Sequence, residues 1–367
     1  MPIKVAITLG TRPEAIKLAP VLTCLQADPR FAPTLICTGQ HRQMVDQVLQ
    51  LFQLRADYDL EIMRPQQSLT QITCNSLLGL EPLLQDIKPD FLLVQGDTTS
   101  AMSAALAGFY QRIPVGHVEA GLRTDDLFNP YPEEANRRLI SQVAQLHFAP
   151  TQLAVDNLKR SGISQGIFLT GNTVIDALLF TARRSPKLEI PNLDWQKYRV
   201  ILATVHRREN WGAPLRHIAR AWLEILDTCP DTALLLPLHL NPTVREPLQQ
   251  MLGKHPRIFL TEPLDYQQVV SALQQCYLVM SDSGGLQEEA PTFGKPVLVL
   301  RKTTERMEAV QAGTARLVGM QQSEIVEQAV HLLTHQDAYA QMANMANPFG
   351  DGRASQRIAE ILVNYGV

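Results

Sequence analysis

Carboxylates recur in the first half of the chain where an apolar, strand-like run gives way to a turn or a helix. Asp97 and Glu119 each follow such a run, and Glu133 and Glu134 follow a proline at the start of a helical pattern. The ends of parallel strands meet at one edge of a sheet, which is where ligands bind. Carboxylates gathered there raise one another's pKa toward neutrality. The pattern therefore indicates general acid–base chemistry.

Each of these carboxylates also has a purely structural interpretation. Asp97 could cap the helix that follows it, and Glu119 could form a buried ion pair with Arg123. One of Glu133 and Glu134 could simply compensate the helix dipole. A magnesium site competes with acid–base chemistry for the whole group, although these motifs contain no Asp-x-Asp or other compact ligand set.

A basic motif, Gly10-Thr-Arg-Pro-Glu-Ala-Ile-Lys, follows the first apolar run. Thr11 and Glu14 form a capping box, which predicts that a helix begins here. Arg12 and Lys17 then place positive charge in the first turns of that helix, where the macrodipole disfavours it. A bound anion would resolve this conflict, whereas two side chains reaching into solvent would need no ligand.

The second half carries a glycine turn, Ser281-Asp-Ser-Gly-Gly-Leu-Gln-Glu-Glu-Ala-Pro, after the apolar run Cys276-Tyr-Leu-Val-Met. Ser281, Asp282 or Ser283 could cap the helix that this turn begins. Glycines at a helix start leave backbone N–H groups open to a phosphate. An ordinary strand-to-helix turn is the alternative interpretation.

Two histidines and a basic loop accompany the glycine turn. His206 follows another apolar run and could donate to a phosphate or shuttle a proton, or it could be a hydrogen-bonded structural histidine. His239 lies at a further strand end, and Arg306 and Glu308 could contact a ligand or remain in a solvated loop. The residues thus favour an enzyme acting on a phosphorylated, nucleotide-linked substrate, and they do not define its reaction.

The elements that must position these motifs alternate between short apolar runs and amphipathic stretches. The predicted strands are Val5–Leu9, Thr34–Cys37, Phe91–Val94, Val115–Val118, His147–Ala149, Ile167–Leu169, Val200–Thr204, Ala233–Leu236, Arg257–Leu260, Tyr277–Met280, Val297–Leu300 and Ala315–Val318. The predicted helices include Met44–Phe52, Ser100–Tyr110, Ala213–Leu226, Ser323–Leu333 and Arg353–Asn364. Continuous apolar strands alternating with helices are typical of parallel sheets covered on both faces. Two such series predict an α/β fold with two doubly wound domains.

We place the N-terminal domain, with the carboxylates, at residues 1–170 plus 352–367. The C-terminal domain, with the phosphate-binding turn, is placed at residues 171–351. Two prolines in Ser185-Pro-Lys-Leu-Glu-Ile-Pro-Asn interrupt the pattern after the first series, and the turn-rich Asn347-Pro-Phe-Gly-Asp-Gly precedes the last helix.

Composition excludes several classes of protein. A chain of 367 residues is comfortable for two globular domains, and its net charge of −3 gives no basic footprint for nucleic acid. Its five cysteines are widely spaced and contain no Cys-x-x-Cys pair, which favours neither disulfides nor a zinc site. We see no signal-peptide pattern and no apolar run long enough to span a bilayer, so we expect a cytoplasmic protein without membrane association.

Taken together, the motifs resemble those of the non-hydrolysing UDP-N-acetylglucosamine 2-epimerases. The segments that carry the resemblance follow the family's order along nearly the whole chain: GTRPEAIK, QHRQM, GDTTS, GHVEAGLRT, PEEANR, TGNTVID, HRREN, HLNP, SDSGGLQEEAP, GKPVLVLR, TER and NPFGDG. The resemblance implies a GT-B type fold, with two Rossmann-like domains around an interdomain cleft and the C-terminal helix returned to the first domain. It also implies a homodimer that uses no metal, nicotinamide or other cofactor.

The reaction implied by the resemblance is reversible inversion at C2 of UDP-N-acetylglucosamine, giving UDP-N-acetylmannosamine for bacterial surface polysaccharides. The family eliminates UDP to form 2-acetamidoglucal and adds it back. Asp97, Glu119 and Glu133 would then carry the proton transfers, and His206 would stabilise the diphosphate or relay a proton. The residues that would bind UDP and sugar, with Glu289 on the ribose, are Arg12, Lys17, Ser283, Gly284, Gly285, Glu289 and Arg306.

In some members of the family a second UDP-N-acetylglucosamine activates the enzyme. The matching positions here are Gln40, Gln43, Gln67, Arg207 and His239. An arginine found near Gln66 in some relatives is absent, and the positions near Leu264 and Val269 depart from the glutamine and phenylalanine of some members. A hydrolysing epimerase, a GT-B glycosyltransferase and a nucleotide-sugar sensor without turnover are the alternative functions.

Overall fold

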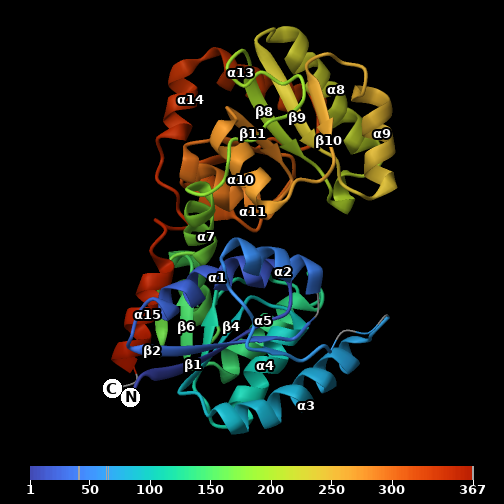
Figure 1. The fold of residues 1–367 in the computed structure, drawn as a ribbon. Coiled ribbons are helices and arrows are strands. Elements are labelled where there is room, and N and C mark those ends of the chain that lie inside the picture. The colour runs from blue at the N-terminus through green and yellow to red at the C-terminus, as the bar shows by residue number, and fades with distance from the viewer. Residues whose placement is uncertain (40–41, 63, 65, 366–367) are drawn as a thin grey trace. The chain divides into compact units, whose positions relative to one another are not determined.

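The computed structural model describes residues 1–39, 42–62, 64 and 66–365 (Figure 1). The chain forms two compact units: unit 1 contains Met1–Phe180 and Phe349–Val367, and unit 2 contains Thr181–Pro348. The first boundary lies later than the one placed from the sequence, because Ala177 and Phe180 of helix α7 (Thr173–Ala182) pack into the core of unit 1.

Within the described residues, unit 1 contains a seven-stranded parallel sheet in the order β3-β2-β1-β4-β5-β6-β7. Its strands are β1 (Ile3–Leu9), β2 (Phe31–Cys37), β3 (Tyr58–Asp59), β4 (Phe91–Gln95), β5 (Val115–Val118), β6 (Leu146–Ala149) and β7 (Ile167–Leu169). The sequence predicted all of these except β3, whose two residues are exposed and therefore give no hydrophobic signal.

Helices cover both faces of this sheet. The helices of unit 1 are α1 (Arg12–Gln26), α2 (Arg42–Leu51), α3 (Leu69–Ile87), α4 (Thr99–Tyr110), α5 (Glu133–Val143), α6 (Gln152–Arg160), α7 and α15 (Ala354–Tyr365). Val5 and Ile7 face a core shared with α1, α2 and α15, whereas Ala6 faces a core shared with α3, α4 and α5. Successive side chains of a strand point to opposite faces, so a sheet buried on both sides produces the continuous apolar runs seen in the sequence.

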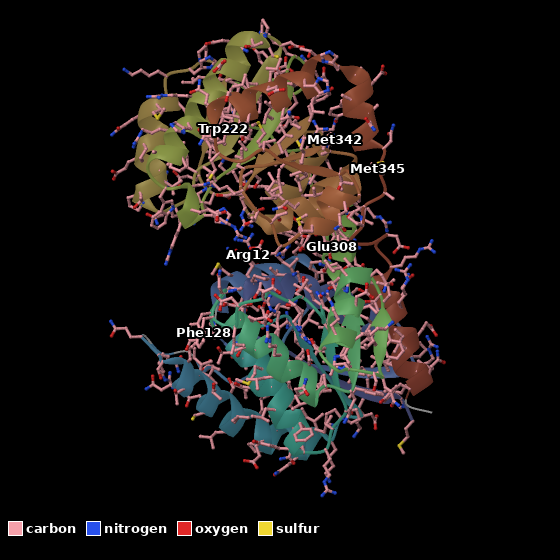
Figure 2. The ribbon with its side chains drawn as sticks, turned by 180° about the vertical axis from the view of Figure 1, so that it is seen from behind. Arg12, Phe128, Trp222, Glu308, Met342 and Met345 are labelled. Atoms are coloured by element: carbon pink, nitrogen blue, oxygen red, sulfur yellow. The ribbon has the colours of Figure 1, made fainter. Side chains whose placement is uncertain are left out.

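Unit 2 repeats this architecture with a six-stranded parallel sheet, in the described residues, ordered β10-β9-β8-β11-β12-β13. Its strands are β8 (Arg199–Thr204), β9 (Thr232–Pro237), β10 (Ile258–Thr261), β11 (Leu278–Ser281), β12 (Val297–Val299) and β13 (Ala315–Leu317). Its helices are η1 (Arg208–Asn210), α8 (Ala213–Thr228), α9 (Pro242–Leu252), α10 (Tyr266–Gln275), α11 (Gly284–Glu289), η2 (Ala290–Phe293), α12 (Met307–Gln311), α13 (Gln322–Thr334) and α14 (Gln336–Ala343). Trp222 of α8 is a fully buried residue of its core (Figure 2).

The strand orders create a topological switch point in each sheet, between β1 and β4 in unit 1 and between β8 and β11 in unit 2. Ligands of open parallel sheets bind beyond the carboxyl ends of the strands at such points. Thr11 and Asp97 follow the first pair of strands, and His206 and Ser283 follow the second. The predicted α/β fold with two Rossmann-like, doubly wound sheets is confirmed, and it brings the sequence motifs to the expected ligand positions of each unit.

Across the ranges that the structure describes, none of the helices combines the length and the apolar character needed to cross a membrane.

Candidate active site

Glu119 directly follows β5, and its side chain is buried. Lys17 Nζ lies 2.5 Å from Oε1, the Asn172 amide donates to the same oxygen at 3.2 Å, and the Gln95 amide donates to Oε2 at 2.5 Å. One ammonium and two amide donors favour the charged form of a carboxylate. The Glu119 backbone has a φ of 65°, in the left-handed region that residues other than glycine seldom adopt. Strain of this kind is concentrated at functional sites.

Arg123 does not form the structural ion pair with Glu119 that the sequence left open. Its guanidinium donates instead to the carbonyl of Leu122 and to the hydroxyls of Ser141 and Ser161. Lys17, 102 positions from Glu119 in the chain, takes that place. The Lys17 ammonium is therefore held against Glu119 inside unit 1 and does not simply reach into solvent.

Glu14, in the first turn of α1, accepts hydrogen bonds that hold the surrounding loops in place. The Glu14 carboxylate accepts the backbone N–H groups of Gly10 and Thr11, both at 2.7 Å, as expected from the capping motif. Thr98 donates its hydroxyl to the same carboxylate at 2.5 Å, which joins the end of β4 to the start of α1. Arg12 lies half-buried in this turn. The two strand ends at the switch point of unit 1 are thus linked through a buried acid.

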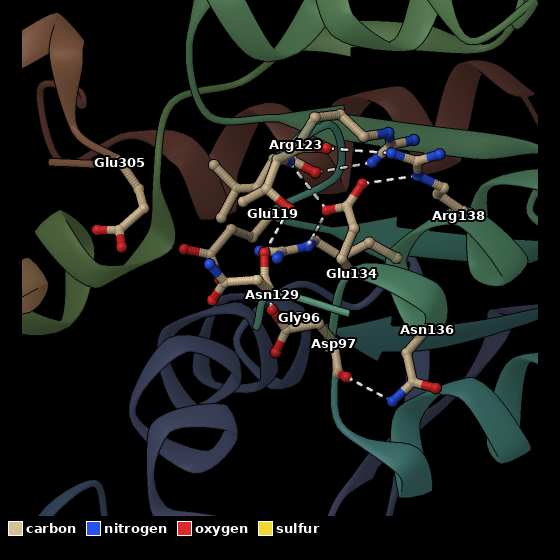
Figure 3. A network of polar contacts seen from close by, with 12 residues as sticks. Gly96, Asp97, Glu119, Arg123, Asn129, Glu134, Asn136, Arg138 and Glu305 are labelled. Atoms are coloured by element: carbon tan, nitrogen blue, oxygen red, sulfur yellow. Dashed lines mark hydrogen bonds and ion pairs between the residues drawn. The ribbon is translucent and has the colours of Figure 1, made fainter. Parts of the chain in front are cut away.

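Asp97 follows β4 through Gly96, whose φ is 72°. The backbone on both sides of the connection is anchored, because His117 Nε2 donates to the Gly96 carbonyl at 2.7 Å and the Asn136 amide donates to the Asp97 carbonyl at 2.8 Å (Figure 3). Burial lowers the pKa of His117 to about 3, so its ring is neutral when it donates. Thr98, not Asp97, is the N-cap of α4. The capping interpretation of Asp97 is therefore wrong.

The Asp97 carboxyl has the electrostatics of an acid–base group. Burial raises its pKa, and the negative charges of Glu119 and Glu133 act in the same direction. Arg137, whose Nη1 lies 3.2 Å from Oδ2, and Lys17 oppose the rise without cancelling it. A carboxyl group with a raised pKa exchanges protons closer to neutral pH, which is what general acid–base catalysis requires.

Glu133 and Glu134 both begin α5, but their environments differ. Glu134 is fully buried, and its carboxylate accepts Arg137 Nε at 3.1 Å, Arg138 Nε at 2.7 Å and the Thr124 N–H at 3.1 Å (Figure 3). Glu133 Oε2 is buried and has no hydrogen-bond partner in the described part of the chain. A buried acceptor without a donor is costly. Glu134 therefore has a structural role, and Glu133 is the one of the two that is left to meet a ligand.

His206 follows β8, and Asp282 follows the neighbouring strand β11. Asp282 Oδ1 lies 2.9 Å from His206 Nδ1, and Oδ2 accepts the backbone N–H groups of His206 and Arg207 and the Asn210 amide, each at 2.9 Å. Burial acts to raise the pKa of Asp282, but these donors outweigh it, and the pKa lies below its usual value. The His206 side chain is 40% exposed. One ring nitrogen of His206 thus lies against a carboxylate oxygen, and the side chain can be reached from solvent.

The glycine turn connects β11 to α11 as predicted. Ser283 is the N-cap residue of α11 but makes no side-chain capping hydrogen bond. Ser281 Oγ accepts the Ser283 N–H at 2.9 Å. The Asp282 carboxylate accepts the backbone N–H of His206, in the loop after β8, and does not cap α11. The prediction that one of these side chains caps the helix is therefore wrong. A Cβ atom at Gly284 would lie 3.1 Å from Arg306 Cζ, so a larger residue would push this guanidinium away from the backbone.

The remaining residues predicted to bind UDP surround this turn in unit 2. Arg306 Nε donates to Glu288 at 2.8 Å, and the Tyr266 hydroxyl lies 3.4 Å from Glu289 Oε1. Glu289 is in the last turn of α11 and is 7% exposed. Gly285 follows Gly284 in the first turn of the same helix. The structure therefore gathers Ser283, Gly284, Gly285, Glu289 and Arg306 around one short helix.

The residues matched to an activating second ligand do not all lie within the described structure, and those that do have different local contacts. Gln40 and the side chain of Gln43 lie outside the described residues. Gln67 donates to the Ile62 carbonyl at 2.7 Å and accepts the Arg64 N–H at 2.9 Å, so it stabilises its own loop. In unit 2, the His239 ring stacks on His206 with centroids 5.8 Å apart, and Arg207 Nε donates to the Asp282 carbonyl at 3.0 Å.

Sequence reasoning missed the residues that hold the predicted acids and histidine in place. These are Gln95 and Asn172 at Glu119, Arg137 at Asp97, and Asp282 at His206. Gln95 carried a usable signal, because a polar residue at the last position of a buried strand needs a partner. Within the described ranges, no three His, Cys, Asp or Glu side chains come together as ligands for a metal ion.

Two parallel sheets with acid–base groups and a glycine turn at their switch points define a two-unit α/β enzyme. A family model described as UDP-N-acetylglucosamine 2-epimerase matches residues 23–363. The UDP-N-acetylglucosamine 2-epimerase of Yersinia pestis is 50% identical over 374 residues, which covers 99% of each chain. The chain belongs to the UDP-N-acetylglucosamine 2-epimerase family and is an enzyme of that family.

Solved structures agree with this assignment. The UDP-GlcNAc 2-epimerase from Neisseria meningitidis, bound to UDP-GlcNAc, is 48% identical with a TM-score of 0.87, covering 99% of this chain and all of that one. A Staphylococcus aureus protein in complex with UDP is 41% identical with a TM-score of 0.88, covering 99% of this chain and 96% of that one. The family resemblance and the GT-B type fold class expected from the sequence are confirmed.

Proposed function

We propose that this enzyme inverts C2 of UDP-N-acetylglucosamine by eliminating UDP and adding it back. The C2 proton leaves as the C1–O bond to UDP breaks, which gives 2-acetamidoglucal. A proton then reaches the opposite face of C2 while a UDP oxygen rebuilds the bond to C1, and the product is UDP-N-acetylmannosamine. The sequence of steps needs no oxidant, since both UDP and the hydrogen count are conserved. Bound UDP-GlcNAc and UDP in two similar structures support the choice of substrate.

Elimination is favoured over direct proton abstraction because C2 has no adjacent carbonyl to acidify its proton. The reaction then needs an acid and a base near C2, together with fixed positive groups on the departing diphosphate. The observation that carries the proposal is the environment of Asp97, a half-buried carboxyl group whose pKa is raised by desolvation and which has the negative charges of Glu119 and Glu133 acting on it.

The proton transfers are assigned to the three carboxylates as a set. Asp97 is best suited to exchange a proton, because its pKa is raised by burial. Glu119 supplies a fixed negative charge, because Lys17 and two amides hold its carboxylate. Glu133 is the third member, because its buried Oε2 has no hydrogen-bond partner in the described chain and can accept one from the substrate.

Unit 2 is proposed to hold UDP through the glycine turn. The N–H groups of Ser283, Gly284 and Gly285 and the Arg306 guanidinium would face the diphosphate, where fixed donors stabilise developing charge better than water does. Glu289 would accept the ribose hydroxyls. His206 would contact the diphosphate oxygen that leaves C1. The family resemblance adds Arg12 and Lys17 to the residues that bind UDP and the sugar.

Further parts of the proposal rest on the family resemblance. The enzyme would be a cytoplasmic homodimer that uses no metal or nicotinamide, and its product would supply N-acetylmannosamine for a surface polysaccharide. Gln40, Gln43, Gln67, Arg207 and His239 would belong to a second, regulatory nucleotide-sugar site. A rate that rises more steeply than hyperbolically with UDP-N-acetylglucosamine concentration would support such a site.

Positional isotope exchange tests the elimination step. UDP-N-acetylglucosamine is prepared with ¹⁸O in the bridge between C1 and the diphosphate and is incubated with the enzyme without an acceptor. Free UDP can rotate its terminal phosphate, so ¹⁸O should appear in non-bridging positions of recovered substrate. An isotope that stays in the bridge while epimer accumulates would contradict the proposal. Release of free N-acetylmannosamine would indicate the hydrolysing reaction, and binding without turnover would indicate a sensor.

A further inference from the structure

One buried carboxylate joins the two functional loops of unit 2. Asp282 is the residue immediately before the Ser283-Gly-Gly turn, and both of its oxygens are directed to the loop that carries His206. The two loops follow adjacent parallel strands, with Thr204 of β8 in register with Ser281 of β11. The hydroxyls of these two residues lie 2.6 Å apart, which ties the strand ends together.

The two oxygens of Asp282 have different partners. Oδ2 accepts three N–H groups, from the backbone of His206 and Arg207 and from the Asn210 amide, each at 2.9 Å. Oδ1 lies 2.9 Å from His206 Nδ1, within ion-pair distance, and otherwise has no hydrogen-bond partner in the described chain, so the ring nitrogen is its nearest available donor. Asp282 is fully buried, so water does not replace these donors. An ionised carboxylate can only accept hydrogen bonds, and a neutral imidazole carries its proton on one nitrogen alone.

We propose that Asp282 is a positioning residue that holds His206 in the Nδ1–H tautomer, so that Nε2 is the ring nitrogen that exchanges a proton with the departing diphosphate. The alternative Nε2–H tautomer would place the Nδ1 lone pair 2.9 Å from an anionic oxygen, which is repulsive. When UDP leaves, the imidazolium form of His206 passes its Nε2 proton to the diphosphate oxygen that was bonded to C1 and becomes the neutral Nδ1–H ring, and the return step restores that proton to Nε2. This inference rests on the role proposed for His206.

Among the described residues, the other groups around the His206 ring make no hydrogen bond or ion pair with its nitrogens, so Asp282 is the group that determines the tautomer. His239 faces the ring by stacking, with the planes 21° apart. The Arg207 guanidinium points elsewhere, since Nε donates to the Asp282 carbonyl and Nη1 lies 3.5 Å from Glu305. Trp211 donates its indole N–H to the His206 carbonyl at 3.4 Å and thus contacts the backbone.

The tautomer can be observed directly in the wild-type chain. Long-range ¹H–¹⁵N correlation spectra of histidine-labelled enzyme distinguish Nδ1–H from Nε2–H rings, and a His206→Gln spectrum assigns the signal among the nine histidines. We expect His206 to be Nδ1–H whenever its ring is neutral. A neutral Nε2–H ring would overturn the proposal, and this measurement requires neither turnover nor a variant at Asp282.

Asp282→Asn tests the consequence for turnover. Its amide oxygen can still accept the backbone N–H groups, while its NH₂ group faces Nδ1 and donates to it, which favours the Nε2–H tautomer. We expect kcat to fall on the order of 10²-fold with a much smaller change in KM, because general acid–base catalysis contributes at least that factor. An unchanged tautomer together with an unchanged kcat would overturn the proposal.

Asn210→Ala is the matched control, because it removes one donor to Oδ2 and leaves Oδ1 facing His206. His206 should remain Nδ1–H in this variant, and a switch to Nε2–H would contradict the assignment to Oδ1. Failure of the proposed function gives a different result: wild-type turnover by His206→Gln would remove His206 from the reaction whatever its tautomer, while the isotope exchange at the C1 bridge would still report elimination.

Discussion

Lys17 and Glu119 form an ion pair inside unit 1, with Nζ 2.5 Å from Oε1 and side chains that are 15% and 5% exposed. The pair fastens the first helix to the end of β5. The attraction between two buried opposite charges offsets the free energy that it costs to remove them from water. A single buried charge has no such compensation. Lys17 therefore offsets the free-energy cost of burying a charged Glu119 in unit 1.

Lys17→Met should destabilise unit 1 by about 3 kcal/mol, because it leaves the Glu119 charge without its ammonium. The double variant Lys17→Met/Glu119→Gln should be more stable than Lys17→Met, since the remaining group is then neutral. Thermal unfolding followed by circular dichroism measures both. All three tryptophans, Trp195, Trp211 and Trp222, belong to unit 2, so their fluorescence monitors the other unit as an internal control. A double variant less stable than Lys17→Met would contradict the argument.

The titration of Asp97 should move in opposite directions in two variants. Glu119→Gln removes a negative charge that raises the pKa of Asp97, so the pKa should fall. Arg137→Gln removes a positive charge that lowers it, so the pKa should rise. The limb of the kcat/KM profile that reports Asp97 should shift to lower and higher pH respectively, and Glu119→Gln should also lose most of its turnover. Shifts in the same direction would exclude Asp97 as the titrating group.

Asp97→Asn should abolish most turnover yet stabilise the fold near neutral pH. Because the pKa of Asp97 is raised in the folded state, ionising it costs stability once the pH exceeds the unfolded value of about 3.9. The gain in Tm should therefore be present at pH 7 and vanish below that unfolded value. Asp28→Asn is a matched control of opposite sign, because hydrogen bonds from Arg30 lower the pKa of Asp28. A loss of Tm in Asp97→Asn at pH 7 would be the contrary result.

Variants of the two adjacent acids of α5 should affect different properties: one should lower the stability of the fold and the other the rate of turnover. Glu134→Gln weakens the hydrogen bonds to Arg137 and Arg138 and should lower Tm, because the buried Arg137 guanidinium then keeps, among the described residues, only Asp97 as its anionic partner. Glu133→Gln should reduce kcat by at least about 10²-fold with little change in Tm, because its buried oxygen has no partner in the described structure to lose. Thermal unfolding and steady-state rates of the two variants provide the comparison, and a reversed pattern would exchange their roles.

The sheets could be predicted from sequence because both faces of each strand are buried. Apolar runs such as Val115–Val118 and Ile167–Leu169 coincide with β5 and β7, and most other strands differ by one to three residues at an end. The exposed pair Tyr58–Asp59 had no such signal. Strand ends next to glycines and acids also placed Asp97, Glu119 and His206 at the carboxyl ends of β4, β5 and β8.

The contacts that tune these residues could not be predicted in the same way, because they join distant parts of the chain. Sequence proximity suggested Arg123 as the partner of Glu119, whereas the partner, Lys17, is 102 positions away. Asp282 was considered only as a local helix cap, and it holds a loop 76 positions earlier. Local propensity identifies turns and caps, but long-range ion pairs follow from the strand order, which emerges only when the sheet is assembled.

The central claim is that the C2 hydrogen is exchanged with acidic groups of the enzyme while the sugar nucleotide is regenerated intact. Incubation of UDP-N-acetylglucosamine with the enzyme in D₂O tests it most directly, with the C2 position of the product read by NMR and mass spectrometry. The account predicts UDP-N-acetylmannosamine that carries solvent deuterium at C2 and retains its UDP. Epimerised product that keeps protium at C2 would contradict it.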